Sequence, residues 1–166
     1  MPRFNEIADR YIAMFNEPDD GVRRRRVEEL FTEDAVYIMF NNYPFVGHDA
    51  IFKQVTVSHR IYVPLGFRFA SSHNAVGHHN LVRFGWVLLS ADTGDADMMG
   101  SDVLVLAPDD RVSADYQFHD RVSSVPYDRL RPVDELFGDV LNADELARYR
   151  EAFANVGRWR GAVASD

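Results

Sequence analysis

The clearest hydrophobic pattern along the chain lies in residues 98–120 and predicts two strands joined by a tight turn. Residues 101–107 hold four consecutive large apolar residues, too many for a strand that water reaches on both faces. The next residues, 108–111, are turn formers, because proline presets φ and aspartate side chains bond to nearby backbone. Residues 112–120 then alternate between apolar and polar, which places the two sets of side chains on opposite faces of a second strand.

One face of the second strand carries a carboxylate, an amide and an imidazole, supplied by Asp115, Gln117 and His119. Such a face is natural where a strand lines a pocket. It is equally natural in an antiparallel sheet with one solvated side. Both interpretations stay open from the sequence.

The rest of the chain supplies helices before this hairpin and after it. Apolar residues at helical spacing or in alternation predict helices over 4–15, 22–31 and 49–57 and strands over 35–40, 61–70 and 79–90. Asp49 is expected to cap the third helix. After residue 122 the chain turns polar, and we expect a short helix over 133–140 and a last helix that begins at Asn142.

This order predicts an α+β fold, with helices packed on the concave side of a curved antiparallel sheet that encloses a cone-shaped cavity. We expect residues 1–122 to form the cone domain. Residues 123–166 are expected to form a C-terminal helical extension packed on that domain.

Composition narrows the classes of partner and chemistry. The formal net charge of −8, from 26 acidic and 18 basic residues, argues against nucleic acid or an anionic membrane as a partner. The chain has no cysteine, so it has no disulfide and no thiolate nucleophile. No apolar run reaches the ~18 residues of a membrane span, and the charged N-terminal segment is not expected to act as a signal peptide. We therefore expect a cytoplasmic protein.

Several stretches resemble the SnoaL-like polyketide cyclases, which share the nuclear transport factor two-like fold with ketosteroid isomerase and limonene epoxide hydrolase. The resemblance rests on NEPDDGVRRRRVEELFTEDAVYIM, VGHDAI, HHNLVRFGW, SDVLVLAPDDRV and the closing aromatic strand. It covers roughly residues 4–120. It implies the cone-shaped fold and a homodimer formed through the outer face of the sheet.

The resemblance also assigns positions to three catalytic patterns. On the ketosteroid isomerase pattern, Tyr11 and Asp102 fall on the donor pair that polarises a substrate carbonyl, which requires a protonated aspartic acid in a dry pocket. The isomerase base position holds Met39, and the cyclase acid/base position holds Gln117; neither side chain is a base. The arginine of the epoxide hydrolase pattern is matched by Arg83, but its carboxylate partner is missing.

His119 and Asp115 are then the side chains that can move a proton. Imidazole titrates near neutral pH, and a carboxylate is a common general base. The two lie four residues apart on one strand, about 13 Å, so direct contact between them is not expected. A structural role stays open for Asp102, Tyr11 and His119.

We expect a small enzyme that cyclises or isomerises an apolar, oxygen-bearing molecule of the polyketide or terpenoid kind, in secondary metabolism, by acid/base chemistry. We expect no cofactor, since the sequence has no phosphate loop and no dinucleotide fingerprint. We expect no metal either, because adjacent strand residues such as His78 and His79 would point in opposite directions. Asp102 and Tyr11 would hold the oxyanion, and His119 or Asp115 would move the proton. The residues expected to form the substrate-binding wall are Tyr37, Met39, Arg83 and Gln117.

Two alternatives stay open. One is addition of water to an epoxide, or loss of water, in the same pocket; a water held between Arg83 and a carboxylate would favour it. The other is a non-catalytic module that binds a ligand or serves only in dimerisation. A cavity filled by the protein's own aromatic side chains would favour this second alternative.

Overall fold

The computed structural model describes residues 2–39, 43–121, 123 and 132–151. The chain divides into two compact units, Met1–Ser124 and Val125–Asp166. This division lies two residues from the boundary expected from the sequence, and the packing of the extension on the cone domain stays a prediction. None of the helices in the described residues combines the length and the hydropathy of a membrane span.

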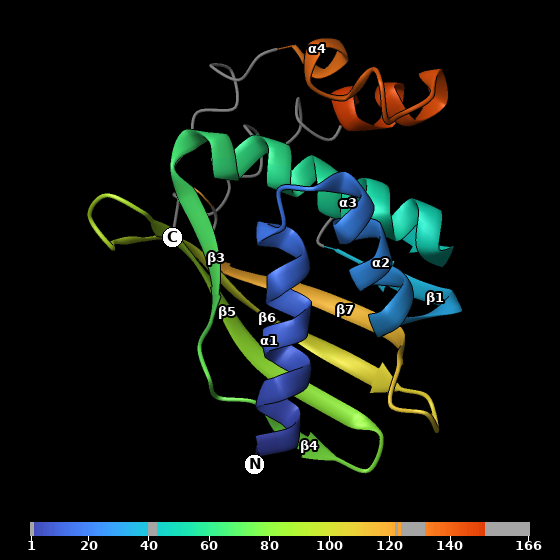
Figure 1. The fold of residues 1–166 in the computed structure, drawn as a ribbon, viewed down its shortest axis with the longest axis vertical. Coiled ribbons are helices and arrows are strands. Elements are labelled where there is room, and N and C mark those ends of the chain that lie inside the picture. Colours follow the sequence, from blue (N-terminus) through green and yellow to red (C-terminus); the bar gives the residue numbers. More distant parts are fainter. Residues whose placement is uncertain (1, 40–42, 122, 124–131, 152–166) are drawn as a thin grey trace, which may run out of the picture. The chain divides into compact units, whose positions relative to one another are not determined.

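Three helices of the first unit, α1 (Pro2–Asn16), α2 (Asp20–Leu30) and α3 (Gly47–Tyr62), cover one face of the sheet (Figure 1). An apolar stripe with the predicted helical spacing buries α1 against the sheet. The side chain of Asp19 caps α2 by accepting a hydrogen bond of 2.8 Å from the Val22 amide.

Helix α3 is longer than predicted. It begins after an N-cap at Val46 rather than at Asp49, and it continues to Tyr62, where a strand was expected. The helix extends because Ile61 and Tyr62 are buried on its apolar face. A 3-10 turn and Gly66, which has a φ of +82°, end it.

Within the described residues the sheet has seven strands, in the order β2-β1-β7-β6-β5-β3, with β4 paired to β5. The strands are β1 (Phe31–Ile38), β2 (Pro44–Val46), β3 (Phe67–Ser71), β4 (Val76–His78), β5 (Leu81–Ser90), β6 (Ala96–Leu106) and β7 (Val112–Arg121). The pairing of β1 with β7 is parallel, and the other pairs are antiparallel. The expectation of an antiparallel sheet is therefore corrected at this one pair. The pair can be parallel because the whole intervening chain serves as its crossover connection.

The two faces of β7 alternate as predicted. Asp115 is fully buried beneath the helices, whereas Tyr116 and Phe118 are exposed on the opposite, outer face of the sheet. The polar face of the strand is therefore the interior one. This result supports the interpretation that the face lines a pocket over the interpretation that water solvates it.

The second unit contains the short helix α4 (Val133–Phe137), which ends three residues earlier than predicted. A further helix covers residues 143–151. Asn142 caps it as expected, because its side chain accepts from the Glu145 amide (3.0 Å) and Glu145 accepts from the Asn142 amide (2.8 Å). Phe153 and Val156, which continue the apolar stripe of this helix in the sequence, lie outside the described residues.

Candidate active site

A cluster of three polar side chains lies on the interior face of the sheet. The Tyr11 hydroxyl on α1 donates a hydrogen bond of 2.7 Å to Oδ2 of Asp115 on β7. In the ladder between β6 and β7, Asp102 pairs with Gln117 and Leu104 pairs with Asp115. The two carboxyl groups are therefore diagonal neighbours on one face, beneath the helix that carries Tyr11.

The interior holds both carboxyl groups in their neutral form near pH 7. Burial raises the pKa of Asp102 well above its usual range, and repulsion from Asp115 raises it further. Burial also raises the pKa of Asp115 to about 8, although the hydrogen bond from Tyr11 opposes this shift. Within the described residues, neither oxygen of Asp102 has a partner with hydrogen-bond geometry; the nearby Gln117 and Tyr11 only lower its pKa somewhat. Two neutral acids on one face can donate hydrogen bonds as well as exchange protons.

Tyr11 itself stays protonated. Burial, together with the charges of Asp102 and Asp115, raises its pKa well above the usual value. The resemblance paired Tyr11 with Asp102 as the two donors to a substrate. In the structure the Tyr11 hydroxyl is instead bonded to Asp115.

His119 lies on the same face, diagonal to Asp102 on the side away from Asp115 in the ladder. Its ring stands edge-on to Trp86, with 5.3 Å between ring centroids and an interplanar angle of 81°. In the ladder Gly100 separates these two residues, and a Cβ at Gly100 would lie 2.5 Å from Cζ2 of Trp86. Burial lowers the pKa of His119 to about 4, so this imidazole is neutral over most of the physiological range.

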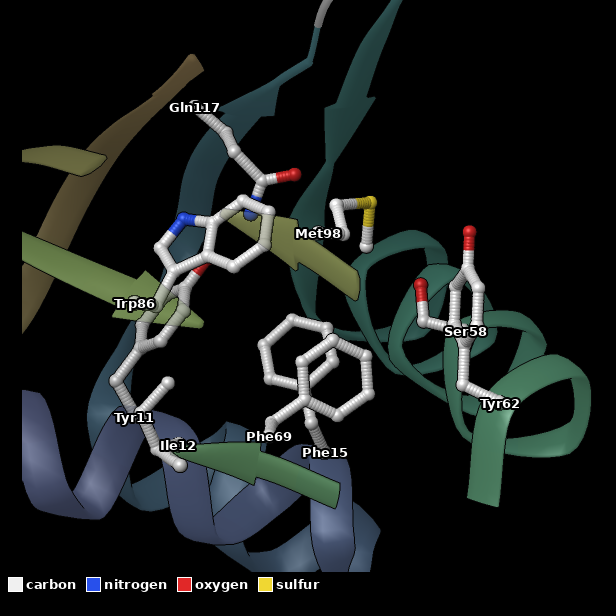
Figure 2. A pocket seen from close by; sticks show the side chains of 9 residues that line it. All are labelled: Tyr11, Ile12, Phe15, Ser58, Tyr62, Phe69, Trp86, Met98 and Gln117. Atoms are coloured by element: carbon white, nitrogen blue, oxygen red, sulfur yellow. The ribbon is translucent and has the colours of Figure 1, made fainter. Parts of the chain in front are cut away.

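A small cavity of about 20 Å³ adjoins the cluster (Figure 2). This volume has room for about one water molecule. The cavity is lined by Tyr11, Ile12, Phe15, Ser58, Tyr62, Phe69, Trp86, Met98 and Gln117. Of the residues singled out from the sequence, Tyr11 and Gln117 reach it. Asp102, Asp115 and His119 are not among its lining side chains, so any effect they have on its contents passes through neighbours such as Tyr11 and Gln117.

The other expected wall residues are placed differently. Tyr37 is buried on β1 and pairs with Asp115 in the ladder, next to the cluster. Met39 is half-buried and directly follows the end of β1. Arg83 does not line the cavity: it is exposed on the outer face, because its neighbours Val82 and Phe84 point inward on an alternating strand.

Seven lining residues were not among the site residues expected from the sequence, namely Ile12, Phe15, Ser58, Tyr62, Phe69, Trp86 and Met98. Ser58 and Tyr62 are four residues apart on α3 and therefore share one face of the helix. The sequence did not place these two side chains on the helix, because the helix was expected to end at Val57. Among the described residues, no group of three His, Asp or Glu side chains has the arrangement of a metal site.

Comparison with solved structures finds the same fold, with high similarity in one case. A proposed isomerase of the SnoaL-like family from Agrobacterium tumefaciens is 30% identical, with a TM-score of 0.66, over 72% of this chain and 99% of that protein. A proposed SnoaL-like polyketide cyclase from Jannaschia sp. is 17% identical, with a TM-score of 0.55, over 72% and 89% of the two chains. A nuclear transport factor two-like protein of unknown function from Exiguobacterium is 19% identical, with a TM-score of 0.54, over 70% and 99%. Comparison of the sequence with family models and with curated proteins gives no match.

Proposed function

The chain belongs to the SnoaL-like family, and from this premise we propose that it is a cofactor-independent isomerase or cyclase. Its substrate would be a small apolar molecule with a carbonyl oxygen, of the polyketide or terpenoid kind. The observation that carries the proposal is the buried cluster of Tyr11, Asp102 and Asp115 next to an aromatic cavity. Buried carboxyl groups with raised pKa values are frequent in acid/base active sites.

Asp115 is the proposed proton acceptor. A base is most effective when its pKa lies near the working pH, and the pKa of Asp115 is about 8. The pKa of His119, about 4, makes that imidazole the weaker base. Asp115 is half ionised at about pH 8, and its charge then keeps Asp102 neutral by repulsion. The two acids therefore take different roles at that pH.

Tyr11 connects Asp115 to the cavity, because its side chain both lines the cavity and donates to the Asp115 carboxylate. A proton leaves the carbon next to the substrate carbonyl for the Tyr11 oxygen, while the Tyr11 proton passes to Asp115. The enolate oxygen that forms is stabilised by a hydrogen bond from the Gln117 amide, which lines the cavity opposite Asp102 in the ladder. Return of the proton through Tyr11 to a different carbon completes an isomerisation. Alternatively, attack of the enolate carbon on a second carbonyl closes a ring, and the proton held by Asp115 returns through Tyr11 to the alkoxide oxygen that forms.

A non-catalytic ligand-binding module is the second candidate. The observation that favours it is the small size of the cavity: the surrounding side chains, many of them aromatic, leave a volume of only about 20 Å³. The epoxide hydrolase alternative loses its support, because Arg83 lies on the outer face and cannot hold a water with a carboxylate of the interior.

The test is hydrogen–deuterium exchange at the activated carbon of 2-tetralone, an apolar bicyclic ketone, followed by proton NMR in D₂O. Wild-type protein should accelerate exchange over buffer, and Asp115→Asn should reduce the acceleration by about a hundredfold or more. Asp120→Asn is the matched control, since this aspartate is exposed on the same strand. Exchange no faster than in buffer, or unchanged in Asp115→Asn, would reject the enzymatic role and leave the binding module.

A further inference from the structure

Four aromatic rings form a continuous row along the cavity. They follow in the order Tyr11, Phe15, Phe69 and Tyr62, with centroid distances of 5.4, 5.1 and 5.9 Å between successive rings. All four line the cavity. Only the two rings at the ends of the row carry a hydroxyl group, so the row is polar at both ends and apolar between them.

The Tyr62 end of the row carries a second hydroxyl. Ser58 lies one helical turn before Tyr62 on α3, and both line the cavity. The Ser58 oxygen accepts a hydrogen bond of 3.3 Å from the Gln54 amide, which leaves the Ser58 proton to be donated. Figure 2 shows the two hydroxyl groups on one side of the cavity, with Tyr11 and the Gln117 amide on the other side.

The middle of the cavity offers little to an oxygen atom. The side chains between the two ends are Phe15, Phe69 and Met98, all buried. A ligand oxygen placed there would lose its hydrogen bonds to water without replacement, which is unfavourable. An apolar skeleton gains contact with the rings at the same place.

We propose that the cavity binds a flat, apolar molecule with an oxygen atom at each end. The Gln117 amide donates to one oxygen, beside Tyr11, and Ser58 and Tyr62 bind the other. This inference rests on the proposed function for the chemistry at the Tyr11 end, and it adds the substrate class and the residues that recognise the distant oxygen. Entry of such a skeleton requires the cavity to widen, and Met98, an unbranched and flexible side chain, is the wall residue best suited to move.

Two rigid probes that differ by one hydroxyl test the inference: 2-naphthol and 2,6-dihydroxynaphthalene, with binding measured by calorimetry. The diol should bind wild-type protein about tenfold more tightly, which corresponds to one additional hydrogen bond. The diol can bind in two equivalent orientations, and this symmetry accounts for a factor of about two of the gain in affinity. Tyr62→Phe keeps the ring of the row and should reduce the gain to that factor, while the affinity for 2-naphthol stays the same.

Tyr116→Phe, on the outer face of the sheet, is the matched control and should preserve the full gain. Ser58→Ala is the second variant and should reduce the gain in part. The inference is overturned if the diol and 2-naphthol bind wild-type protein within a factor of two, if neither binds at millimolar concentration, or if the gain survives both Tyr62→Phe and Ser58→Ala. These outcomes are separate from the exchange test, which measures Asp115. If the diol binds more tightly than 2-naphthol in a way that depends on Tyr62, but the protein does not accelerate hydrogen–deuterium exchange, the two-ended site is supported and only the proposed chemistry is rejected.

Discussion

Tyr11 and Asp115 are 104 residues apart in the chain, and the tyrosine hydroxyl donates a 2.7 Å hydrogen bond to the carboxylate in the interior of the protein. The bond joins α1 to β7 and favours the ionised form of Asp115. Tyr11→Phe removes the donor and should therefore raise the pKa of Asp115 above about 8. The titration of the Asp115 carboxyl carbon, followed by ¹³C NMR, measures this change.

The same variant should lower the free energy of unfolding by about 1–3 kcal/mol, because a buried oxygen loses its partner. Tyr43→Phe provides the comparison, since Tyr43 is exposed. An unchanged Asp115 titration in Tyr11→Phe would show that the hydrogen bond does not influence the carboxyl group.

The stability of the protein should fall between pH 6.5 and pH 8. Asp115 has a pKa near 3.8 when exposed and about 8 in the fold, so over this range the folded state holds a proton that the unfolded state has lost. Each such proton lowers the free energy of unfolding by about 1.4 kcal/mol per pH unit. His119, with its pKa lowered from 6.5 to about 4, acts in the opposite direction, but only below pH 6.5.

Urea unfolding at several pH values measures this slope. Asp115→Asn should make the fall of the free energy of unfolding with pH less steep, by the contribution of one proton, because the amide does not titrate. Asp109→Asn should leave it unchanged, since the pKa of Asp109 is lowered by Arg111 and its titration lies below this range. A wild-type stability that rises from pH 6.5 to 8 would contradict the raised pKa values.

Gly100→Ala should destabilise the fold by about 3 kcal/mol or more, since buried overpacking against backbone cannot relax easily. The new Cβ would lie 2.1 Å from the Phe118 carbonyl oxygen and 2.5 Å from the Trp86 ring. Thermal and urea unfolding measure the loss. Gly21→Ala is the comparison: the nearest atom to its Cβ is 3.2 Å away, on the side chain of Asp19. Equal effects of the two variants would show that the contact between Trp86 and His119 tolerates a side chain at Gly100.

Met98→Ala should enlarge the cavity and improve binding of 2-naphthol. Met98 is buried and lines the cavity, so its truncation should lower the free energy of unfolding by about 2–5 kcal/mol. Calorimetric titration measures the affinity, and Met99→Ala, at a half-buried neighbour that does not line the cavity, serves as the control. A weaker affinity in Met98→Ala would show that Met98 holds the probe rather than restricting its entry.

The outer face of the sheet should mediate a homodimer. It carries exposed apolar side chains on β4, β5 and β7, namely Val76, Leu81, Tyr116 and Phe118, and exposed apolar groups favour association. Phe118→Asp should produce monomers in sedimentation velocity experiments, with little change in the stability of the monomer, because the side chain is 54% exposed. Thr93→Asp, in an exposed turn, should leave the dimer intact. Wild-type protein that sediments as a monomer would reject the dimer.

The sequence by itself determined the elements whose patterns are local. The alternation in residues 112–120 predicted which side chains of β7 share a face, because side-chain direction in a strand reverses at every residue. The first two helices followed from their apolar spacing in the same way. The motifs that resemble the SnoaL-like cyclases indicated the fold, and the similarity to a solved member confirms it.

Only the tertiary structure decided which side chains meet and how burial changes their chemistry. The partner of Tyr11 is Asp115 rather than Asp102 because that choice depends on how α1 lies across the sheet. The outward position of Arg83 depends on the register of β5, and Tyr62 joined the cavity because tertiary burial extended α3 beyond its expected end. The pKa values of Asp115 and His119 follow from desolvation, which is a property of the packed interior and not of any stretch of sequence.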